Sequence, residues 1–144
     1  VSGDGIVLEN LTAPFAYPCV CDVKLGTRLY DDQADPGKKA RMIAQANETT
    51  SGSTGLRICG LQILDGKNTQ VKLDRRFGRS LGADNLRDGF VRFFSDAAGS
   101  MVRSGVIEST ICKLDALLHA LRQIEPGSLA MYSRFAECAI FTRL

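Results

Sequence analysis

A short apolar segment that carries two opposite charges constrains the fold of this chain more than any other feature. The run "VCDVKL", residues 20–25, lies between Pro18 and Gly26, and its apolar residues are typical of a β-strand. Side chains two residues apart in a strand point to the same face of the sheet. We therefore expect Asp22 and Lys24 to lie side by side on an otherwise apolar strand.

Two interpretations of this acid–base pair are open from the residues alone. Oppositely charged side chains on one face of a strand can form a surface ion pair, which is weak and aids solubility at a sheet edge. Alternatively, Lys24 neutralises charge on a transferred phosphoryl group, while Asp22 holds a hydroxyl group or aligns a nucleophile. The second interpretation makes Asp22 and Lys24 candidate catalytic residues that act on an anionic ligand.

The remaining pattern predicts an α+β fold in one domain of 144 residues. Apolar runs between turn residues predict strands at 6–8, 18–26, 56–64 and 69–74, and one in the tail at 128–144. Helical spacing predicts helices at 35–47, from 84 or 85 to 94, and within 104–127. We expect a flexible loop at 51–55 and a basic connector at 75–82. This order does not repeat a βαβ unit.

Composition excludes several classes of function. A net charge of +2 gives no global field that would favour nucleic acid. The five cysteines are an odd number without a repeating framework, and Cys19 and Cys21 have C-x-C spacing with no histidine nearby. We expect reduced thiols in a cytosolic or nuclear protein rather than disulfides or a zinc site. No apolar run approaches the roughly 20 residues of a membrane span.

Basic residues gather in two places outside the predicted strand. Lys38 and Arg41 are three apart in the helix that follows it, and so share a helix face. The segment "RRFGRSL" adds Arg75, Arg76 and Arg79. A solvated helix face and a plain basic loop are the ordinary interpretations of such charge. Near an acid–base pair, however, these cations suit a polyphosphate ligand better than a neutral one.

Other common signatures of catalysis are missing from the sequence. There is no G-x-x-x-x-G-K-[ST] loop, and no G-x-G-x-x-G follows a strand. We expect the one histidine, His119, to be a half-buried residue of the longest helix rather than a general base, and one histidine there gives no Ser-His-Asp arrangement. A nucleotide, if one binds, is held by other means.

Several motifs together resemble the inositol polyphosphate kinase family. "PCVCDVKLG" is similar to the family signature P-x-x-x-D-x-K-x-G, and "ETTSGSTGLRICGLQI" resembles the segment TSxSxGxRxCGMQ that follows the basic helix of the family. "FGRSL" before a helix that ends in "RFF" matches the family pattern, and "VLENLT" looks like its interlobe hinge. These motifs cover most of residues 6–133 in the family's order. The segments "LYDD", "KKARM" and "ETTSGS" resemble those of fungal multikinases most, and those of inositol hexakisphosphate kinases next.

The resemblance implies a protein-kinase-like fold, of which this chain is mostly the C-terminal lobe from the hinge onward, and it implies ATP and Mg²⁺ as cofactors. The hinge backbone around Glu9 and Leu11 would bind adenine, and Asp22 would hold the ribose. Lys24 would lie between the γ-phosphate and the accepting inositol hydroxyl. These roles suit phosphoryl transfer, which needs positioning and charge neutralisation more than covalent chemistry.

The resemblance also implies contacts to an inositol polyphosphate substrate. Lys38 and Arg41 would contact phosphates from the basic helix, together with Lys24. Arg75, which comes just before "FGRSL", is a further candidate. The dense negative charge of such a substrate explains why basic residues cluster on a nearly neutral protein.

Two departures from the family pattern lead to further expectations. The family has an N-terminal lobe with a lysine for the ATP phosphates, whereas this chain begins near the hinge, so we expect a single, incomplete kinase domain over residues 1–144. The magnesium-binding aspartate of the family falls at Arg134, so no metal-binding residue is assigned. We expect either a stretch missing between Ser133 and Arg134 or a diverged copy of the kinase.

From the resemblance we expect a multikinase that transfers the γ-phosphoryl group of ATP to hydroxyl groups of inositol tris- or tetrakisphosphate. Two alternatives stay open, namely an inositol hexakisphosphate kinase that makes pyrophosphates and an inactive homologue that only binds inositol phosphates. The family implies a location in nucleus and cytoplasm and, by analogy only, transcription-factor partners. No residue identifies the hydroxyl that is phosphorylated or the oligomeric state.

Overall fold

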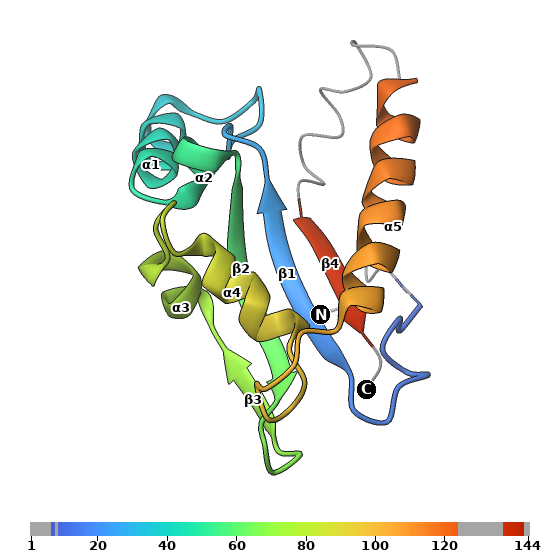
Figure 1. The fold of residues 1–144 in the computed structure, drawn as a ribbon. Helices are drawn as coiled ribbons and strands as arrows, with labels where there is room; N and C mark the ends of the chain where they lie inside the picture. The colour runs from blue at the N-terminus through green and yellow to red at the C-terminus, as the bar shows by residue number, and fades with distance from the viewer. Residues whose placement is uncertain (1–6, 8, 124–136, 143–144) are drawn as a thin grey trace, which may run out of the picture.

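The computed structural model describes residues 7, 9–123 and 137–142, which form an α+β fold around one antiparallel sheet (Figure 1). The four strands lie in the order β3-β2-β1-β4. They are β1 (Cys19–Leu25), β2 (Leu56–Leu64), β3 (Gln70–Leu73) and β4 (Glu137–Thr142). The helices are α1 (Pro36–Asn47), α2 (Thr50–Thr54), α3 (Arg75–Ser80), α4 (Leu86–Phe94) and α5 (Ser104–Arg122).

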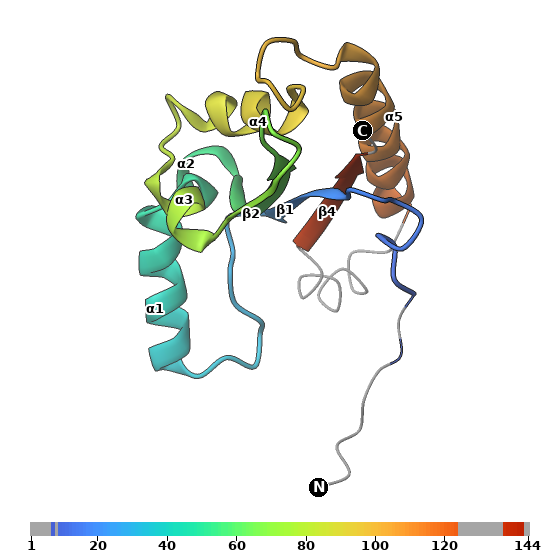
Figure 2. The same ribbon diagram turned by 90° about the horizontal axis from the view of Figure 1, so that it is seen from below.

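One face of the sheet carries the hydrophobic core. Cys19, Cys21 and Val23 alternate along β1 and are at most 4% exposed. Phe93 of α4 and Ile58 of β2 are completely buried against them. α4 and α5 lie on this side of the sheet, whereas α1 projects past the sheet on the opposite side (Figures 1 and 2). The sheet therefore has a core face and a second face, called here the open face.

A β-bulge in β2 decides which residues reach the open face. Asp22 pairs with Gly60 and Val23 pairs with Ile58, so Cys59 is an extra residue opposite the regular strand β1. The extra residue shifts the alternation of β2 by one position. Ile58 consequently stays in the core, while Arg57, the residue before it, turns to the open face.

The helix predicted at 35–47 is confirmed as α1, and the loop predicted at 51–55 is wrong. Asp35 caps α1 by accepting a hydrogen bond of 2.9 Å from the amide of Lys38. Residues 50–54 form the short helix α2, which ends at Gly55 in the left-handed conformation, with φ of 74°. The carbonyl of Gly55 accepts a hydrogen bond of 2.6 Å from the amide of Gly26. This bond ties the end of β1 to the start of β2.

The basic connector predicted at 75–82 is also wrong, because its first six residues form helix α3. The carboxylate of Asp74 accepts a hydrogen bond of 2.8 Å from the amide of Arg76 and so caps this helix. Gly78 lets α3 approach β2 closely, since a Cβ atom at this position would lie 1.8 Å from the carbonyl oxygen of Ile58. The glycine therefore fixes where the basic side chains of α3 stand.

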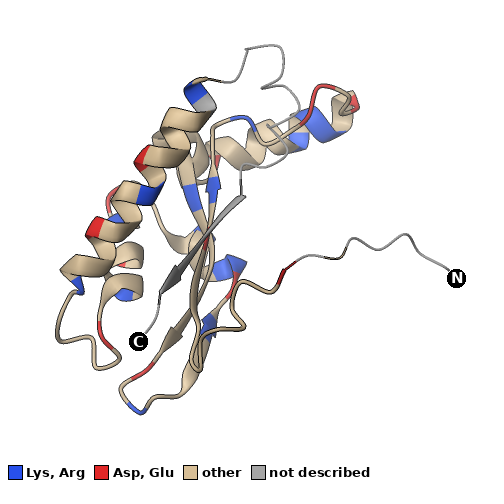
Figure 3. Ribbon diagram, turned by 90° about the vertical axis from the view of Figure 1, so that its right-hand side faces the viewer, with Lys and Arg blue, Asp and Glu red and all other residues tan. Residues whose placement is uncertain are grey.

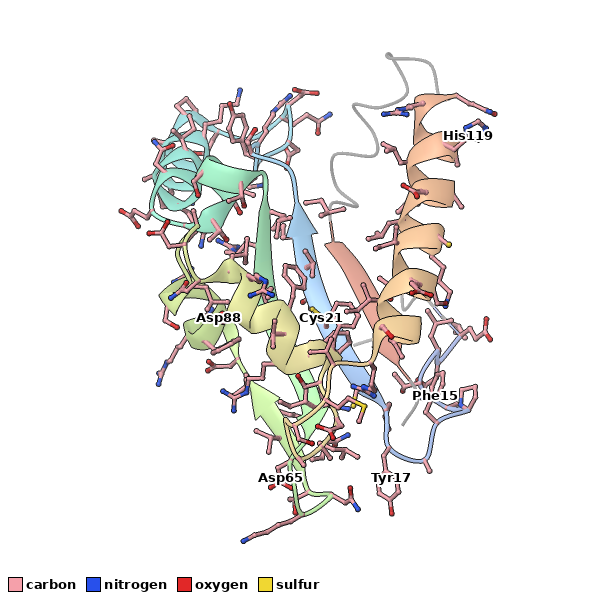
Figure 4. The ribbon with its side chains drawn as sticks, in the orientation of Figure 1. Phe15, Tyr17, Cys21, Asp65, Asp88 and His119 are labelled. Carbon is pink, nitrogen blue, oxygen red and sulfur yellow. The ribbon has the colours of Figure 1, made fainter. Side chains whose placement is uncertain are left out.

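The long helix predicted within 104–127 is confirmed as α5, but much of its apolar stripe is not buried. Ile111, Leu114, Leu117 and Leu118 are between 38% and 52% exposed. His119 is exposed rather than half-buried, and it lies near the far end of α5 from the sheet (Figure 4). Its position argues against a role as the catalytic base at the sheet.

Other predicted elements are confirmed or fall outside the described residues. The hairpin is confirmed, with Asp65 Oδ1 accepting hydrogen bonds from the amides of Lys67 and Thr69 in its turn. Of the strand predicted at 6–8, only Val7 is described, and it lies in no regular structure. The strand in the tail is confirmed as β4, whereas the junction 133/134 lies outside the described residues.

Two remaining predictions concern thiols and membranes. Among the described cysteines, Cys19 and Cys21 are buried, Cys59 is half-buried and Cys112 is exposed. None of the helices in the described ranges combines the length and apolar character that crossing a bilayer requires.

Candidate active site

The predicted acid–base pair lies on the open face of β1. Val20, Asp22 and Lys24 are half-buried and alternate with the buried core residues of the strand. Asp22 and Lys24 therefore share one face of the sheet, as the sequence predicts. Lys and Arg residues occur on the central strands and on α1, which projects on this side of the sheet (Figure 3).

The residues in register with Asp22 on both neighbouring strands are small. Gly60 of β2 and Ala139 of β4 occupy these positions. On the β2 side, the glycine brings no side chain next to the carboxylate.

A third charged residue joins the open face from β2. Arg57 pairs directly with Lys24, and directly opposite residues of an antiparallel pair share a face. The Arg57 side chain is only 8% exposed, and its Nη1 atom donates a long hydrogen bond of 3.4 Å to Thr49 Oγ1. Arg57 was not among the residues predicted from the sequence, although it lies in the motif that resembles TSxSxGxRxCGMQ. Its guanidinium therefore links Thr49, the residue before α2, to strand β2 at the position opposite Lys24.

The short helix α2 contains two buried hydroxyl groups. Thr50 Oγ1 and Ser51 Oγ are fully buried and have no hydrogen-bond partner among the described residues.

Lys38 lies at the start of α1 and contacts two carboxylates, one through its side chain and one through its backbone amide. Its Nζ atom lies 2.9 Å from Asp31 Oδ2, in the segment that connects β1 to α1. Its backbone amide caps the helix with Asp35, and this hydrogen bond lowers the pKa of the Asp35 carboxyl group. Arg41 contributes to the same lowering by its positive charge. The predicted substrate helix is thus anchored at its start by acidic residues.

Arg41 lines a cavity of about 470 Å³ between α1 and α3. The basic residue of α3 that meets it is Arg79, not Arg75. Gln45, Glu48 and Thr49 also line this cavity. Arg75 is the first residue of α3, is exposed, and does not line the cavity. The structure therefore places Arg79 at the same cavity as Arg41. In the sequence prediction Arg79 belonged to the basic connector but was not a candidate site residue.

The predicted adenine-binding segment precedes β1. Glu9 and Leu11 are exposed. Asn10 orders a turn here, because its side-chain oxygen accepts hydrogen bonds from the amide and the hydroxyl of Thr12. Tyr17, which precedes β1, lies at the opposite end of the sheet from α1 (Figures 1 and 4). The segment and the basic helix α1 consequently flank the two ends of β1.

A second cavity, of about 400 Å³, lies beside the hairpin and α4. Asp65, Asp88 and Asp96 are among its lining residues, and Figure 4 labels the first two. Hydrogen bonds from Ser100 and from the amide of Met101 lower the pKa of Asp96. The same hydrogen bonds close the loop between Asp96 and Met101. Neither this cavity nor the one between α1 and α3 is lined by Asp22 or Lys24.

The described residues do not form a metal centre on their own. Within residues 7, 9–123 and 137–142, no three His, Cys, Asp or Glu side chains come together as ligands for an ion. Arg134, the position at which the resemblance would place the magnesium-binding aspartate, lies outside these ranges.

The sequence profile that describes inositol polyphosphate kinases matches residues 5–134. The chain belongs to the inositol polyphosphate kinase family. Inositol hexakisphosphate kinase 3 of Mus musculus is 35% identical over 119 residues, which are 81% of this family member and 29% of the mouse protein. Inositol hexakisphosphate kinase 2 of Homo sapiens is 32% identical over 121 residues, 83% of the chain and 28% of the human protein. The chain thus spans less than a third of these curated relatives.

Two solved structures of inositol phosphate multikinases share the fold of this family member. The structure of the enzyme from S. cerevisiae in complex with ADP and Mn²⁺ has a TM-score of 0.55 at 32% identity and covers 59% of this chain and 40% of that one. The second has a TM-score of 0.63 at 30% identity and covers 70% of this chain and 48% of that one. The predicted α+β, kinase-like fold is confirmed by these likenesses.

Proposed function

We propose that this protein is an ATP-dependent inositol polyphosphate multikinase, which transfers the γ-phosphoryl group to hydroxyl groups of inositol tris- or tetrakisphosphate. The open face of β1 carries this proposal, because it presents Asp22, Lys24 and Arg57 together in a member of the inositol polyphosphate kinase family. A carboxylate next to two cations suits a reaction in which a phosphate is positioned and its charge is neutralised.

The order of residues along β1 supports separate positions for nucleotide and acceptor. The segment with Glu9 and Leu11 precedes the strand, and the basic helix α1 follows it. Asp22, which is nearer to the first segment, would hold the ribose. Lys24, which is nearer to α1, would lie between the γ-phosphate and the acceptor hydroxyl. Lys38 and Arg41 of α1 would then contact phosphates of the acceptor.

The nucleotide would require a divalent cation, and the related yeast structure holds ADP with Mn²⁺. The described part of this chain offers no cluster of ligands for such an ion. We therefore assign roles only to side chains of the open face and of α1. Their contribution is to bind and orient the two anionic reactants and to offset the charge between them.

Product analysis tests the proposal. The protein is incubated with Mg²⁺ and ATP labelled at the γ-phosphate, separately with inositol trisphosphate, tetrakisphosphate and hexakisphosphate. We expect label in phosphate monoesters of the first two compounds. Binding of inositol phosphates without transfer of label to any of them would instead identify an inactive binding homologue.

A hexakisphosphate kinase is the second candidate, because curated relatives at 32–35% identity have that activity in their names. Such an enzyme transfers the phosphoryl group to a phosphate rather than to a hydroxyl. Label that appears only with inositol hexakisphosphate, in a product with a pyrophosphate bond, would favour this candidate over the multikinase.

A further inference from the structure

Arg57 is a buried cation that lies opposite a second cation. The residue is 8% exposed, and it pairs with Lys24 across the β1–β2 ladder. Like charges at directly opposite positions destabilise a sheet, and burial of a guanidinium costs free energy unless polar groups contact it. Within residues 7, 9–123 and 137–142, no carboxylate forms an ion pair with Arg57. Neutral polar groups must therefore stabilise its side chain.

The end of helix α1 provides such groups. Nη1 of Arg57 donates a hydrogen bond of 3.4 Å to Thr49 Oγ1, which itself donates one of 2.8 Å to the carbonyl of Gln45. The free carbonyls in the last turn of a helix carry the negative end of its dipole, so a cation nearby is favourable. α1 has no basic residue of its own in that turn. Arg57 consequently supplies, from strand β2, the positive charge that the sequence of α1 lacks.

α1 packs against the rest of the molecule through its C-terminal end. All 12 of its residues are described, and among them only Ala46, in the last turn, is buried. The helix projects past the sheet (Figure 2). The hydroxyl of Thr49 also lies 3.4 Å from the carbonyl oxygen of Ala46. Arg57 and Thr49 thus contact α1 at the end from which its direction is set.

This contact joins two parts of the molecule to which the proposed function gives different tasks. Lys24, opposite Arg57, would act on the transferred phosphoryl group, and α1 would contact the acceptor. Phosphoryl transfer depends on the separation and alignment of the reacting atoms, and a displacement of about 1 Å can cost about a hundredfold in rate. A change in the direction of α1 would move the acceptor relative to Lys24.

We propose that Arg57 is a positioning residue for phosphoryl transfer, which fixes the end of α1, through Thr49, to the strand position opposite Lys24. It acts through these neighbours and not on the reacting atoms. The inference rests on the proposed function, and it adds that a side chain of β2 aligns the acceptor helix with the catalytic strand.

Four variants test this role. Arg57→Met removes the charge and the donors but keeps the apolar stem, whereas Arg57→Lys keeps the charge. Thr49→Val removes the hydroxyl group at the other end of the contact. Arg103→Met is the matched control, because Arg103 also donates to carbonyls at the end of a helix, namely those of Phe93 and Phe94 in α4. Steady-state kinetics with inositol trisphosphate and ATP are combined with thermal melts of each protein.

We expect Arg57→Met to lower kcat/KM for inositol trisphosphate by about tenfold to a hundredfold and to leave the KM for ATP unchanged. Arg57→Lys should regain part of the loss, because it restores a positive charge at the end of α1. Thr49→Val should show a similar loss, and the double variant should lose little more than Arg57→Met, since both groups act through one contact. Arg103→Met should lower the melting temperature and leave the kinetic constants of the folded enzyme unchanged.

Two kinetic results would overturn the inference. One is a folded Arg57→Met protein that, like Arg103→Met, loses only thermal stability and keeps its kinetic constants. The other is full additivity of Arg57→Met and Thr49→Val, which would show that the two side chains do not act together. In either case the wild type would still transfer the phosphoryl group, so the proposed function would stand.

Hydrogen–deuterium exchange gives a readout that does not need activity. The amides of residues 44–49 should exchange faster in Arg57→Met and in Thr49→Val than in the wild type, whereas those of α4 should keep their rates. Thr49→Val serves both measurements if Arg57→Met does not fold. Faster exchange in the variants of a protein that transfers no phosphoryl group would reject the proposed function and leave Arg57 as the anchor of α1. Unchanged exchange would overturn the inference, whether or not the wild type is active.

Discussion

Lys24 of β1 lies directly opposite Arg57 of β2, on the face of the sheet that is turned away from the core. Two like charges at directly opposite positions of an antiparallel pair destabilise a sheet. Asp22, on the same face two residues before Lys24, brings negative charge to the surroundings. An anion that binds at this end of the open face would therefore reduce the repulsion between the two cations.

Substitution of Lys24 is the most direct test of the reaction. Lys24→Met should lower kcat by about 10²–10³-fold, because it removes a donor aimed at developing charge while its apolar stem is retained. Steady-state kinetics with inositol trisphosphate measure the loss, and a thermal melt shows whether the fold is intact. Lys72→Met on the edge strand β3, where the side chain is exposed, is the matched control. A folded Lys24→Met protein with ordinary turnover would disprove the assignment.

The double variant Lys38→Ala/Arg41→Ala tests the substrate helix. Each lost charge-assisted hydrogen bond costs about 1.5–3 kcal/mol, so the KM for the inositol phosphate should rise by at least about tenfold. The KM for ATP should change little, because α1 follows the strand end away from the adenine-binding segment. Lys67→Ala in the exposed hairpin turn serves as control. Equal increases of both KM values would contradict a role confined to the acceptor.

Gly78 offers a prediction about stability that does not depend on function. Gly78→Ala places a methyl group 1.8 Å from the Ile58 carbonyl oxygen, so α3 must move away from β2. We expect destabilisation at or above the upper end of the range of about 1–3 kcal/mol for overpacking, measured by urea unfolding. Gly82→Ala is the control, because nothing lies within 4 Å of a Cβ atom there. If both variants were equally stable, the close approach of α3 would be wrong.

The cap of α1 predicts a dependence of stability on pH. The hydrogen bond from the Lys38 amide lowers the pKa of Asp35 below its ordinary value of 3.8. Because the folded-state pKa is depressed, the stabilisation is present above pH 3.8 and is lost as the pH falls through the lower folded-state value. Melting temperatures of the wild type should therefore fall more steeply below this pH than those of Asp35→Asn, which keeps a capping oxygen without the charge. Parallel curves for the two proteins would exclude this contribution.

The shared face of Asp22 and Lys24 could be predicted because the alternation of a strand is a local property. Arg57 could not be assigned in the same way. Regular alternation from the buried Leu61 would put residue 57 in the core and Ile58 on the open face, and only pairing with β1 reveals the bulge that reverses this. The location in nucleus and cytoplasm and the protein partners stay predictions.

The short helices were missed because α2 and α3 have only five and six residues, too few to show a helical period, and α2 consists of Thr, Ser and Gly, which are weak helix formers. Asp74 in a capping position and the glycine after residue 54 were the available signals for α3 and α2. Without helix α3, there was no basis for choosing Arg79 over Arg75 as the partner of Arg41. The family itself was correctly predicted, because its motifs are specific and occur in order.

The bulge at Cys59 also bears on how this protein can vary in length. Since Gly60 and Ile58 already pair with consecutive residues of β1, Cys59 takes no place of its own in that ladder. Deletion of this one residue would make the pairing continuous and would leave Arg57 beside Lys24. Strand β2 thus holds a residue without a partner on β1, and a variant that lacks Cys59 should keep the charged side chains of Lys24 and Arg57 in register.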